Sequence, residues 1–280
     1  MKKHLLPLLL TAGALAAGAA QADTGKLLLT GGVSSITGSA GGGIVPWAVI
    51  NSYASSGEWG ATAFASQVGV DDFTLNVFGA SASYDNRWEF SIARQTFKLD
   101  SIGGELRQDI LGIKYHIAGE LLYTALPQIS LGLQYKKHRD FALPQAVGAR
   151  DSSGLDIYLS ASKVFFNQVA GRNLLLNGTI RATKANQTGL LGFGTIEDNN
   201  YQFMFEGSAA VLLNYNLAVG IEFRQKPDQL AFATEQHWRD LFIAWFVNKH
   251  LSVVAGYADL GSIAGLAEQQ GYYLSVEGAW

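Results

Sequence analysis

An alternation of apolar with polar or small residues recurs along most of this chain, and it constrains the fold more than any other feature of the sequence. From Trp59 onward it fills stretches of about 9 to 13 residues. A period of two is the side-chain period of a β-strand, whereas a helix repeats about every 3.6 residues. Twelve such stretches are present: 59–68, 73–84, 87–97, 106–117, 128–137, 155–165, 173–184, 200–213, 215–224, 238–247, 251–258 and 272–280. The sequence therefore predicts an all-β protein.

The two faces of these predicted strands differ in chemistry. In residues 87–97, Trp88 and Phe90 fall on one face, and Glu89 and Ser91 fall on the other. The same division into an apolar, aromatic face and a face of charged or small groups recurs in the other segments. Strands of membrane barrels alternate lipid-facing and lumen-facing side chains in this way.

The connections between the segments alternate in length. Short turns such as 85–86 and 248–250 are followed, one segment later, by longer loops such as 138–154 and 185–199. This alternation predicts a transmembrane antiparallel up-and-down β-barrel with both termini on the short-turn side. The longer loops then face the cell exterior, and we expect residues 145 and 192 to be exposed there.

A soluble β-sandwich is the alternative fold, and three observations count against it. The strands exceed the usual length of about 5–6 residues and match the 9–11 needed to cross a bilayer at a tilt. Charged residues make up 15% of the chain, against about 25% in soluble domains. The last segment ends in Trp280, and a terminal aromatic resembles the assembly signal of bacterial barrel proteins, although Phe is commoner there.

The N-terminus reads as an export signal. Lys2 and Lys3 precede an apolar stretch, and Ala20-Gln21-Ala22 is a small-x-small cleavage pattern, so we expect cleavage after Ala22. The predicted organisation is a signal peptide at 1–22, a Gly-rich segment at 23–58 and an outer-membrane barrel at 59–280. The expected partners are outer-membrane lipid and the barrel-assembly machinery.

Aromatic residues fall near both ends of the predicted strands, as the two interfacial girdles of a membrane barrel require. Those near the short turns are Tyr84, Trp88, Trp245 and Trp280, and those near the longer loops are Tyr201, Trp238, Tyr257 and Tyr272.

Four stretches carry a resemblance to a known family: TGGVSSITGSAGGGIVPWAVI (30–50), RATKANQTGLLGFG (181–194), KPDQL (226–230) and WRDLFIAW (238–245). With them the chain resembles a proteobacterial family of exported proteins catalogued only as a domain of unknown function. The resemblance implies an outer-membrane location and assigns no functional residue.

Several classes of function find no support in the residues. The chain has no Cys and a net charge of −3, which argues against a thiolate metal site and a nucleic-acid partner. The glycines of 31–43 lack the following Gly-Lys-Ser/Thr of a phosphate loop. No His pair has metal-ligand spacing, and His138 and His237 are expected in loops, away from any nucleophile. We therefore expect no metal, no cofactor and no enzyme activity.

The polar faces place charges of both signs inside the predicted barrel. The expected set is Glu89, Lys114, His116, Lys136, Asp156, Arg181, Glu206, Glu222, Arg224 and Glu277. Two interpretations stay open. The charges can simply pair and solvate a narrow interior, or Arg181, Glu206, Glu222 and Arg224 can line a constriction that selects small solutes.

Residues 23–58 are too rich in glycine and too irregular for a lipid-facing strand pair. Unpaired backbone at membrane depth must be enclosed by protein, so we expect Gly31 to Ile50 to enter the lumen from the periplasmic end. In this hypothesis Gly41, Gly42 and Gly43 allow close approach, and Trp47 packs against the wall. A periplasmic lead, or two extra strands of a fourteen-stranded barrel, are the alternatives.

The function predicted from the sequence is a passive, porin-like channel or uptake pore for an unknown small solute. A first alternative is a plugged barrel that transports hydrophobic molecules. A second is a structural or adhesive barrel that acts through loops 138–154 and 185–199, which are short for adhesion.

Overall fold

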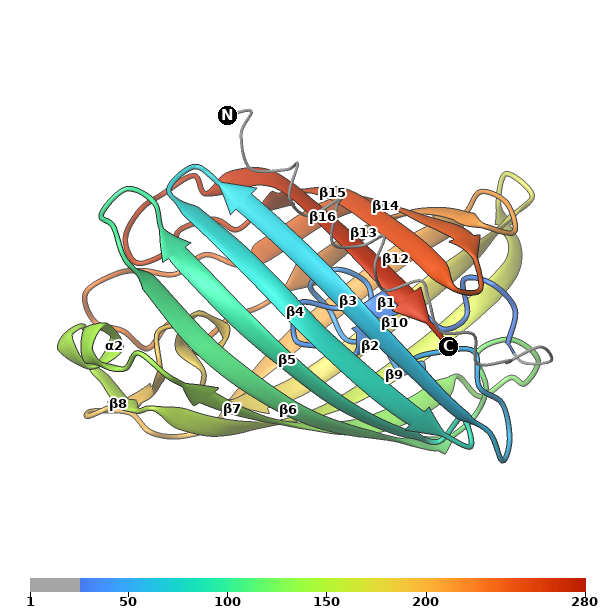
Figure 1. Cartoon of the computed structure of the whole chain (residues 1–280), viewed down its shortest axis with the longest axis horizontal. Coiled ribbons are helices and arrows are strands. Elements are labelled where there is room, and N and C mark those ends of the chain that lie inside the picture. The colour runs from blue at the N-terminus through green and yellow to red at the C-terminus, as the bar shows by residue number, and fades with distance from the viewer. Residues whose placement is uncertain (1–25) are drawn as a thin grey trace.

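The computed structural model describes residues 26–280, so the predicted signal peptide and its cleavage site lie outside the described residues. Twelve antiparallel strands form a closed barrel (Figure 1). They are β3 (Trp59–Val70), β4 (Phe73–Tyr84), β5 (Trp88–Leu99), β6 (Glu105–Ala118), β7 (Gln128–His138), β9 (Ser153–Val169), β10 (Arg172–Thr183), β12 (Gln202–Leu212), β13 (Leu217–Arg224), β14 (Trp238–Asn248), β15 (Leu251–Asp259) and β16 (Gln270–Ala279).

All twelve predicted segments are barrel strands, and each pairs with its neighbours along the chain, so the predicted fold class is confirmed. The barrel closes where β16 meets β3, and Trp280 and Ala61 extend this seam by exchanging backbone hydrogen bonds of 2.9 Å in both directions. No helix within residues 26–280 is long and apolar enough to span a membrane.

The faces of the strands also follow the predicted alternation. On β5, Phe90 is 44% exposed on the outside, whereas the adjacent Glu89 is 1% exposed on the inside. The polar-face residues of the other strands are likewise buried in the barrel interior, apart from the half-buried His116. The outer surface of the barrel is thus largely apolar, which is the arrangement of a protein that faces lipid.

The aromatic girdles are present with one exception. Of the residues predicted at the short-turn end, Tyr84, Trp88 and Trp245 are exposed and Trp280 is half-buried. At the opposite end, Tyr201, Tyr257 and Tyr272 are exposed. Trp238 was expected in the opposite girdle, and this prediction is wrong: its ring is buried inside the barrel, with the Arg224 guanidinium 5.9 Å from the ring centroid. Trp238 begins β14 on the inward-facing parity, next to the equally buried Asp240.

The longer loops fold back over the barrel mouth. The first contains the short helix α2 (Ala142–Ala146) and β8 (Ala149–Asp151), and β8 pairs with β11 (Phe193–Thr195) of the second. In the second loop, the 3₁₀ turn η1 (Asn186–Gly189) and residues up to 195 are buried. The expectation that residue 192 is exposed is therefore wrong, because this loop enters the lumen.

His138 is also not a loop residue. It ends β7 with its side chain turned inward, and its Nε2 lies 2.8 Å from the carbonyl oxygen of Leu190. The inward fold of the second loop supplies this partner, which the sequence pattern alone does not reveal.

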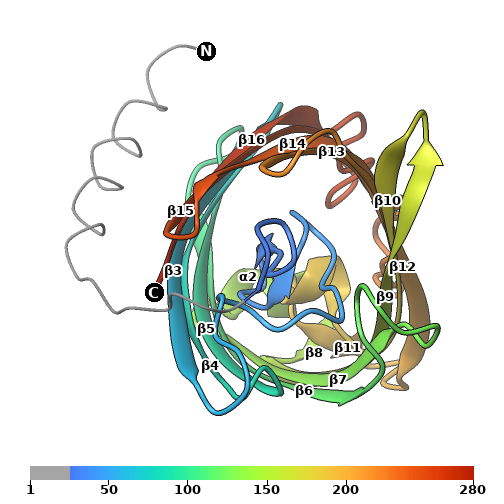
Figure 2. The same ribbon diagram turned by 90° about the vertical axis from the view of Figure 1, so that its right-hand side faces the viewer.

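The segment before the first barrel strand lies inside the barrel. Figure 2, viewed along the barrel, shows its two short strands β1 (Val33–Ser34) and β2 (Ala40–Gly41) within the ring of barrel strands. Every residue from 31 to 54 is buried, and we call these residues the lumenal segment. They form no extra barrel strands, so the barrel has twelve strands and not fourteen.

The topology predicts which positions a membrane-impermeant thiol reagent reaches on intact cells, because the chain has no native Cys. We expect labelling at Glu197→Cys, in the exposed part of a longer loop, and none at Lys249→Cys, in a short turn. Labelling of permeabilised cells controls for expression. The opposite pattern would show that the orientation assigned from the loop lengths is reversed.

Candidate functional site

The candidate site is the interface between the lumenal segment and the inner wall of the barrel. Its most densely bonded residue is Glu222 on β13. One carboxylate oxygen accepts hydrogen bonds of 2.7 Å from the main-chain amides of Gly43 and Ile44. The other accepts from Ser208 Oγ at 2.7 Å and from Trp47 Nε1 at 3.2 Å. The amide of Val45, at 3.4 Å, is a fifth donor, and a carboxylate with five donors is well satisfied away from water.

Two further wall glutamates bind the lumenal segment in the same manner. Glu277 on β16 accepts a hydrogen bond of 2.7 Å from the amide of Ser34. Glu89 on β5 accepts from the amides of Ala40, at 3.1 Å, and Asn51, at 2.8 Å. Three strands distributed around the barrel therefore each present one carboxylate to backbone N–H groups of the segment.

Cationic wall residues bind the carbonyl oxygens. Lys114 Nζ donates to Ala40 at 3.0 Å and to Val49 at 2.9 Å, and it also pairs with Glu89. Arg224 Nη1 donates to Ile44 at 2.8 Å. Neutral side chains complete the set: Gln95 to Ile36, Gln128 to Ala48 and Thr179 to Pro46. The wall thus recognises the backbone of the segment, which satisfies its polar groups without strand pairing.

The predicted glycines lie at the tightest part of this interface. A Cβ on Gly42 would overlap the Glu222 carboxylate, and one on Gly43 would overlap the Tyr273 hydroxyl. Gly41 is equally close to the carbonyl of Val45 within the segment itself. Any side chain at these positions would push the backbone away from the wall. Trp47 is buried beside them, with Nε1 also 2.9 Å from Ser208 Oγ.

The segment also packs against apolar side chains of the wall. Ile36 and Ile44 line a small gap together with Val68, Leu75 and Tyr273. Val33 and Trp47 line a second one with side chains of β10 and β12 to β14, namely Leu175, Ala210, Leu212, Ala218, Phe242, Ala244 and Phe246. The wall of the lumen therefore carries both charged and apolar side chains, and the segment contacts both.

The four charges predicted to line a constriction lie inside the barrel but do not form one group. Arg181 Nε pairs with Glu206 at 2.6 Å, and Arg224 Nε reaches the same carboxylate at 3.3 Å. Glu222 instead binds the lumenal segment. All four side chains are at most 3% exposed, so they line no water-filled passage in this state. Their role in selecting solutes stays a prediction.

The Arg181 pair is part of a longer chain of buried ions. Arg181 Nη1 lies 3.3 Å from Asp156, and Lys136 Nζ lies 2.7 Å from the same carboxylate. Lys136 also donates to the carbonyl of Thr188 at 2.9 Å. This network therefore joins the wall to the inward-folded loop at the long-loop end.

A second buried cation at that end is Lys226 of the motif at 226–230, to which the sequence assigned no role. Lys226 Nζ lies 2.8 Å from Glu235, 3.0 Å from Gln187 and 2.8 Å from the carbonyl of Ser262. Burial lowers the pKa of Lys226 in spite of this carboxylate. Three loops meet here, and only their tertiary arrangement brings these residues together. The motif at 181–194 was visible in the sequence, but it carried no assigned role.

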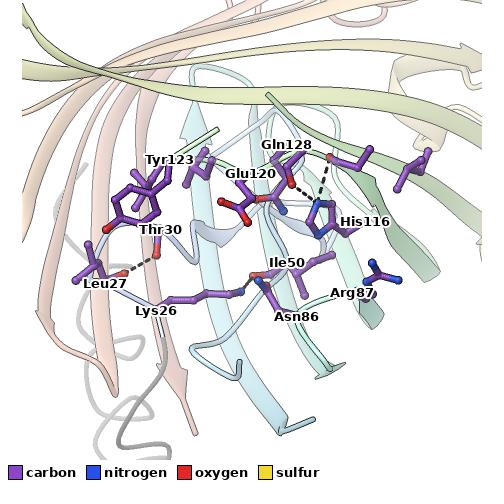
Figure 3. Close-up of a pocket in the computed structure, with 15 residues that line it drawn as sticks. Lys26, Leu27, Thr30, Ile50, Asn86, Arg87, His116, Glu120, Tyr123 and Gln128 are labelled. Atoms are coloured by element: carbon purple, nitrogen blue, oxygen red, sulfur yellow. Dashed lines mark hydrogen bonds between the residues drawn. The ribbon is translucent and has the colours of Figure 1, made fainter. Parts of the chain in front are cut away.

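The mouth at the short-turn end contains an open cavity of about 560 Å³ (Figure 3). Lys26 lies at its edge and donates from Nζ to the carbonyls of Ile50, at 2.6 Å, and Ser52, at 3.2 Å. Removal of its ammonium from water lowers the pKa of Lys26 to about 7. Arg87 and His116 also line the cavity. No group of three or more metal-binding side chains occurs within the described part of the chain.

A closed antiparallel barrel with an apolar outer surface and an occupied lumen defines a transmembrane β-barrel of the outer-membrane type. Residues 30–277 match the model of the family described as "Protein of unknown function (DUF3034)", and the chain belongs to this family, as the sequence motifs predicted. No curated protein matches the sequence.

Solved structures with a similar fold are outer-membrane proteins. The KdgM porin in complex with disordered oligogalacturonate has 10% identity and a TM-score of 0.50, with 78% of this chain and 99% of that chain covered. The Omp33 outer-membrane protein of Acinetobacter baumannii has 10% identity and a TM-score of 0.47, covering 80% and 99%. At such identities the likeness concerns the fold alone.

Proposed function

We propose that this protein is an outer-membrane channel for small hydrophilic solutes whose lumen is closed by residues 31–54 until they move. The observation that carries the proposal is the chemistry of the wall: Glu89, Lys114, Glu222 and Arg224 bind the segment through its backbone. Burying charges costs more than burying apolar groups of similar size. Charges that are costly to bury are suited to a wall that water also contacts. We therefore propose a second state in which the segment has left and water fills the lumen.

The size of the barrel supports the same proposal. Eight strands enclose an interior that side chains just fill, whereas 16–18 strands leave an open channel. Twelve strands lie between these limits and leave room for residues 31–54 and for the inward-folded loop at 185–195. Displacement of the lumenal segment would open a narrow aqueous pore beside that loop without a change in the barrel itself.

The remaining features of the proposal concern partners and chemistry. Among the described residues, the hydrogen bonds that histidine rings form are to backbone groups and to no Ser or Thr hydroxyl, and we propose a transport role without enzyme activity. We also propose that Trp280 serves recognition by the barrel-assembly machinery, which its position at the closing seam is consistent with.

Transport of hydrophobic molecules is a second candidate, and one observation favours it. Phe242 and Phe246 on β14 and Leu175 on β10 give one side of the lumen an apolar surface against the segment. A molecule with a long apolar part could bind that surface once the segment leaves. Uptake of a fluorescent fatty acid, set against swelling of liposomes in small sugars, separates the two candidates.

The test of the channel proposal weakens the attachment of the segment without removing it. In the triple variant Glu89→Gln, Glu222→Gln and Glu277→Gln, three anionic acceptors become neutral, so each bond to a backbone amide loses its charge assistance. In planar bilayers we expect the parent protein to be mostly closed and the variant to open at least about tenfold more often, the change that 1.4 kcal/mol of lost binding produces.

Glu105→Gln, on the exposed outer face of β6, is the matched control and should behave as the parent. A triple variant that assembles, retains heat-modifiable migration on gels and stays as closed as the parent would contradict the channel proposal.

A further inference from the structure

The lumenal segment approaches a second acidic residue of the wall, whose surroundings differ from those of Glu222. Asp240 on β14 lies directly opposite Glu222 in the strand register. Its side chain is 6% exposed, and neither carboxyl oxygen accepts a hydrogen bond from any residue of the described chain. The two adjacent acids therefore differ in their hydrogen bonding, because donors surround the Glu222 carboxylate and none reaches the Asp240 carboxyl group.

The space in front of Asp240 is closed by the lumenal segment. A Cβ on Gly43 would lie 3.2 Å from Asp240 Oδ2, and it would overlap the Tyr273 hydroxyl, which also has no hydrogen-bond partner among the described residues. Tyr273 is 4% exposed. The two unpartnered groups thus converge on the backbone of Gly43, next to the amide that Glu222 binds.

No cation compensates the Asp240 carboxyl in this arrangement. Within residues 26–280, Asp240 forms no salt bridge, and the nearest arginine along β13, Arg224, is already bound to Glu206 and to the carbonyl of Ile44. The inner face of β15 contributes Ala258 opposite Asp240 and no titratable group, β16 contributes Tyr273, and the lumenal segment contributes the backbone of Gly43. Glu222 is the acidic side chain that faces Asp240, and its five hydrogen-bond donors favour its ionised form.

A buried carboxylate without donors or a cation costs several kcal/mol, and a neighbouring carboxylate increases that cost. The neutral acid avoids both penalties. We propose that Asp240 carries a proton while the lumenal segment is seated, and that loss of this proton releases the segment. The inference rests on the proposed channel function and adds the ligand that controls its opening, a proton bound at the contact between β14 and Gly43.

The direction of the pH dependence follows from the two states. The seated state holds a proton on Asp240, whereas the open state exposes the carboxyl to water, where it is ionised at neutral pH. The open state therefore binds fewer protons, and a rise in pH favours it. The ionised Asp240 carboxylate then repels the ionised Glu222 carboxylate, which binds the amides of Gly43 and Ile44.

The experiment records single-channel openings of the full-length mature protein between about pH 6 and about pH 10, the range in which buried carboxyl groups lose their proton. We expect the open probability of the parent to rise by up to about tenfold per pH unit, the limit for one proton. The near-isosteric variant Asp240→Asn has no proton to lose and should stay closed throughout. Asp259→Asn, on the outward parity of the neighbouring strand β15, should retain the response of the parent.

A second measurement reports the position of the segment independently of conductance. Ser35 is fully buried in the lumenal segment, and the chain has no native Cys. We expect a methanethiosulfonate reagent to label Ser35→Cys increasingly as pH rises, relative to the exposed Glu197→Cys, and not to do so when Asp240→Asn is also present. Heat-modifiable migration of each variant shows that the barrel stays folded.

The outcomes separate this inference from the channel proposal. If removal of residues 26–50 opens the barrel but the parent shows no pH response, or Asp240→Asn retains it, the proton site is wrong and the channel stands. Openings that follow sodium concentration at constant pH would also overturn it, because the site would then bind a metal cation. If removal of the segment opens nothing, the channel proposal itself fails.

Discussion

Deletion of residues 26–50 is expected to raise the conductance of the barrel severalfold. The deletion removes most of the backbone that Glu222, Glu89 and Lys114 bind, and it empties the part of the lumen that these residues fill. The wall charges that are exposed in this way gain water in place of the segment. Planar-bilayer recordings of parent and deletion protein, reconstituted at equal amounts, give the comparison.

The deletion should leave the barrel itself intact. All twelve barrel strands begin after residue 58, and their ladder includes no residue of the lumenal segment. Heat-modifiable migration on gels checks assembly, and the triple glutamine variant should show the same direction of change at smaller size. A deletion protein that assembles and conducts no more than the parent would rule out closure by this segment.

The second large effect concerns stability. Arg181→Met is expected to destabilise the barrel by about 3 kcal/mol or more, because it leaves Glu206 and Asp156 as buried carboxylates that have each lost a partner. For a chain of this size, 1 kcal/mol corresponds to about 2–4 °C in Tm. We therefore expect heat-modifiable migration to be lost about 10 °C below the parent.

Arg107→Met is the matched control, because the two arginines form close pairs in different surroundings. Arg107 Nε lies 2.8 Å from Asp140 at the long-loop end of β6, and the Arg107 side chain is 46% exposed, against 2% for Arg181. Exposed pairs contribute little, so this variant should unfold at the temperature of the parent. Equal losses in the two variants would show that burial of the Arg181 network is not what stabilises it.

The strand pattern was predictable because alternation is local. Side chains alternate along any strand, so Glu89 lies on the opposite face of β5 from Trp88 and Phe90 whatever the rest of the chain does. Lipid outside the barrel requires an apolar outer face on every strand. The same reasoning placed Glu222 and Arg181 inside. It failed for Trp238, because an aromatic side chain near a strand end can lie either at the membrane interface or in the barrel interior. Only its parity within the folded strand distinguishes these two positions.

The partners of the interior charges could not be read from the sequence. Glu222 and Arg224 are two residues apart on one strand, yet the first binds amides of Gly43 and Ile44 and the second binds Glu206 and the Ile44 carbonyl. The contacts with Gly43 and Ile44 join residues more than 170 positions apart. No local pattern encodes such a distance.

The sequence by itself determined the barrel, its twelve strands, its two faces and the presence of a Gly-rich segment that lipid cannot accommodate, because each follows from side-chain period, strand length or backbone hydrogen bonding. Only the tertiary structure decided how the lumen is filled. It brings the N-terminal segment and the loop at 185–195 inside together, assigns donors to Glu222 and none to Asp240, and buries the charges that the sequence suggested as a pore lining. The physical reason is that buried polar groups need hydrogen-bond partners, and the partners inside this barrel are far apart in the sequence. Only closure of the β3–β16 seam brings them together.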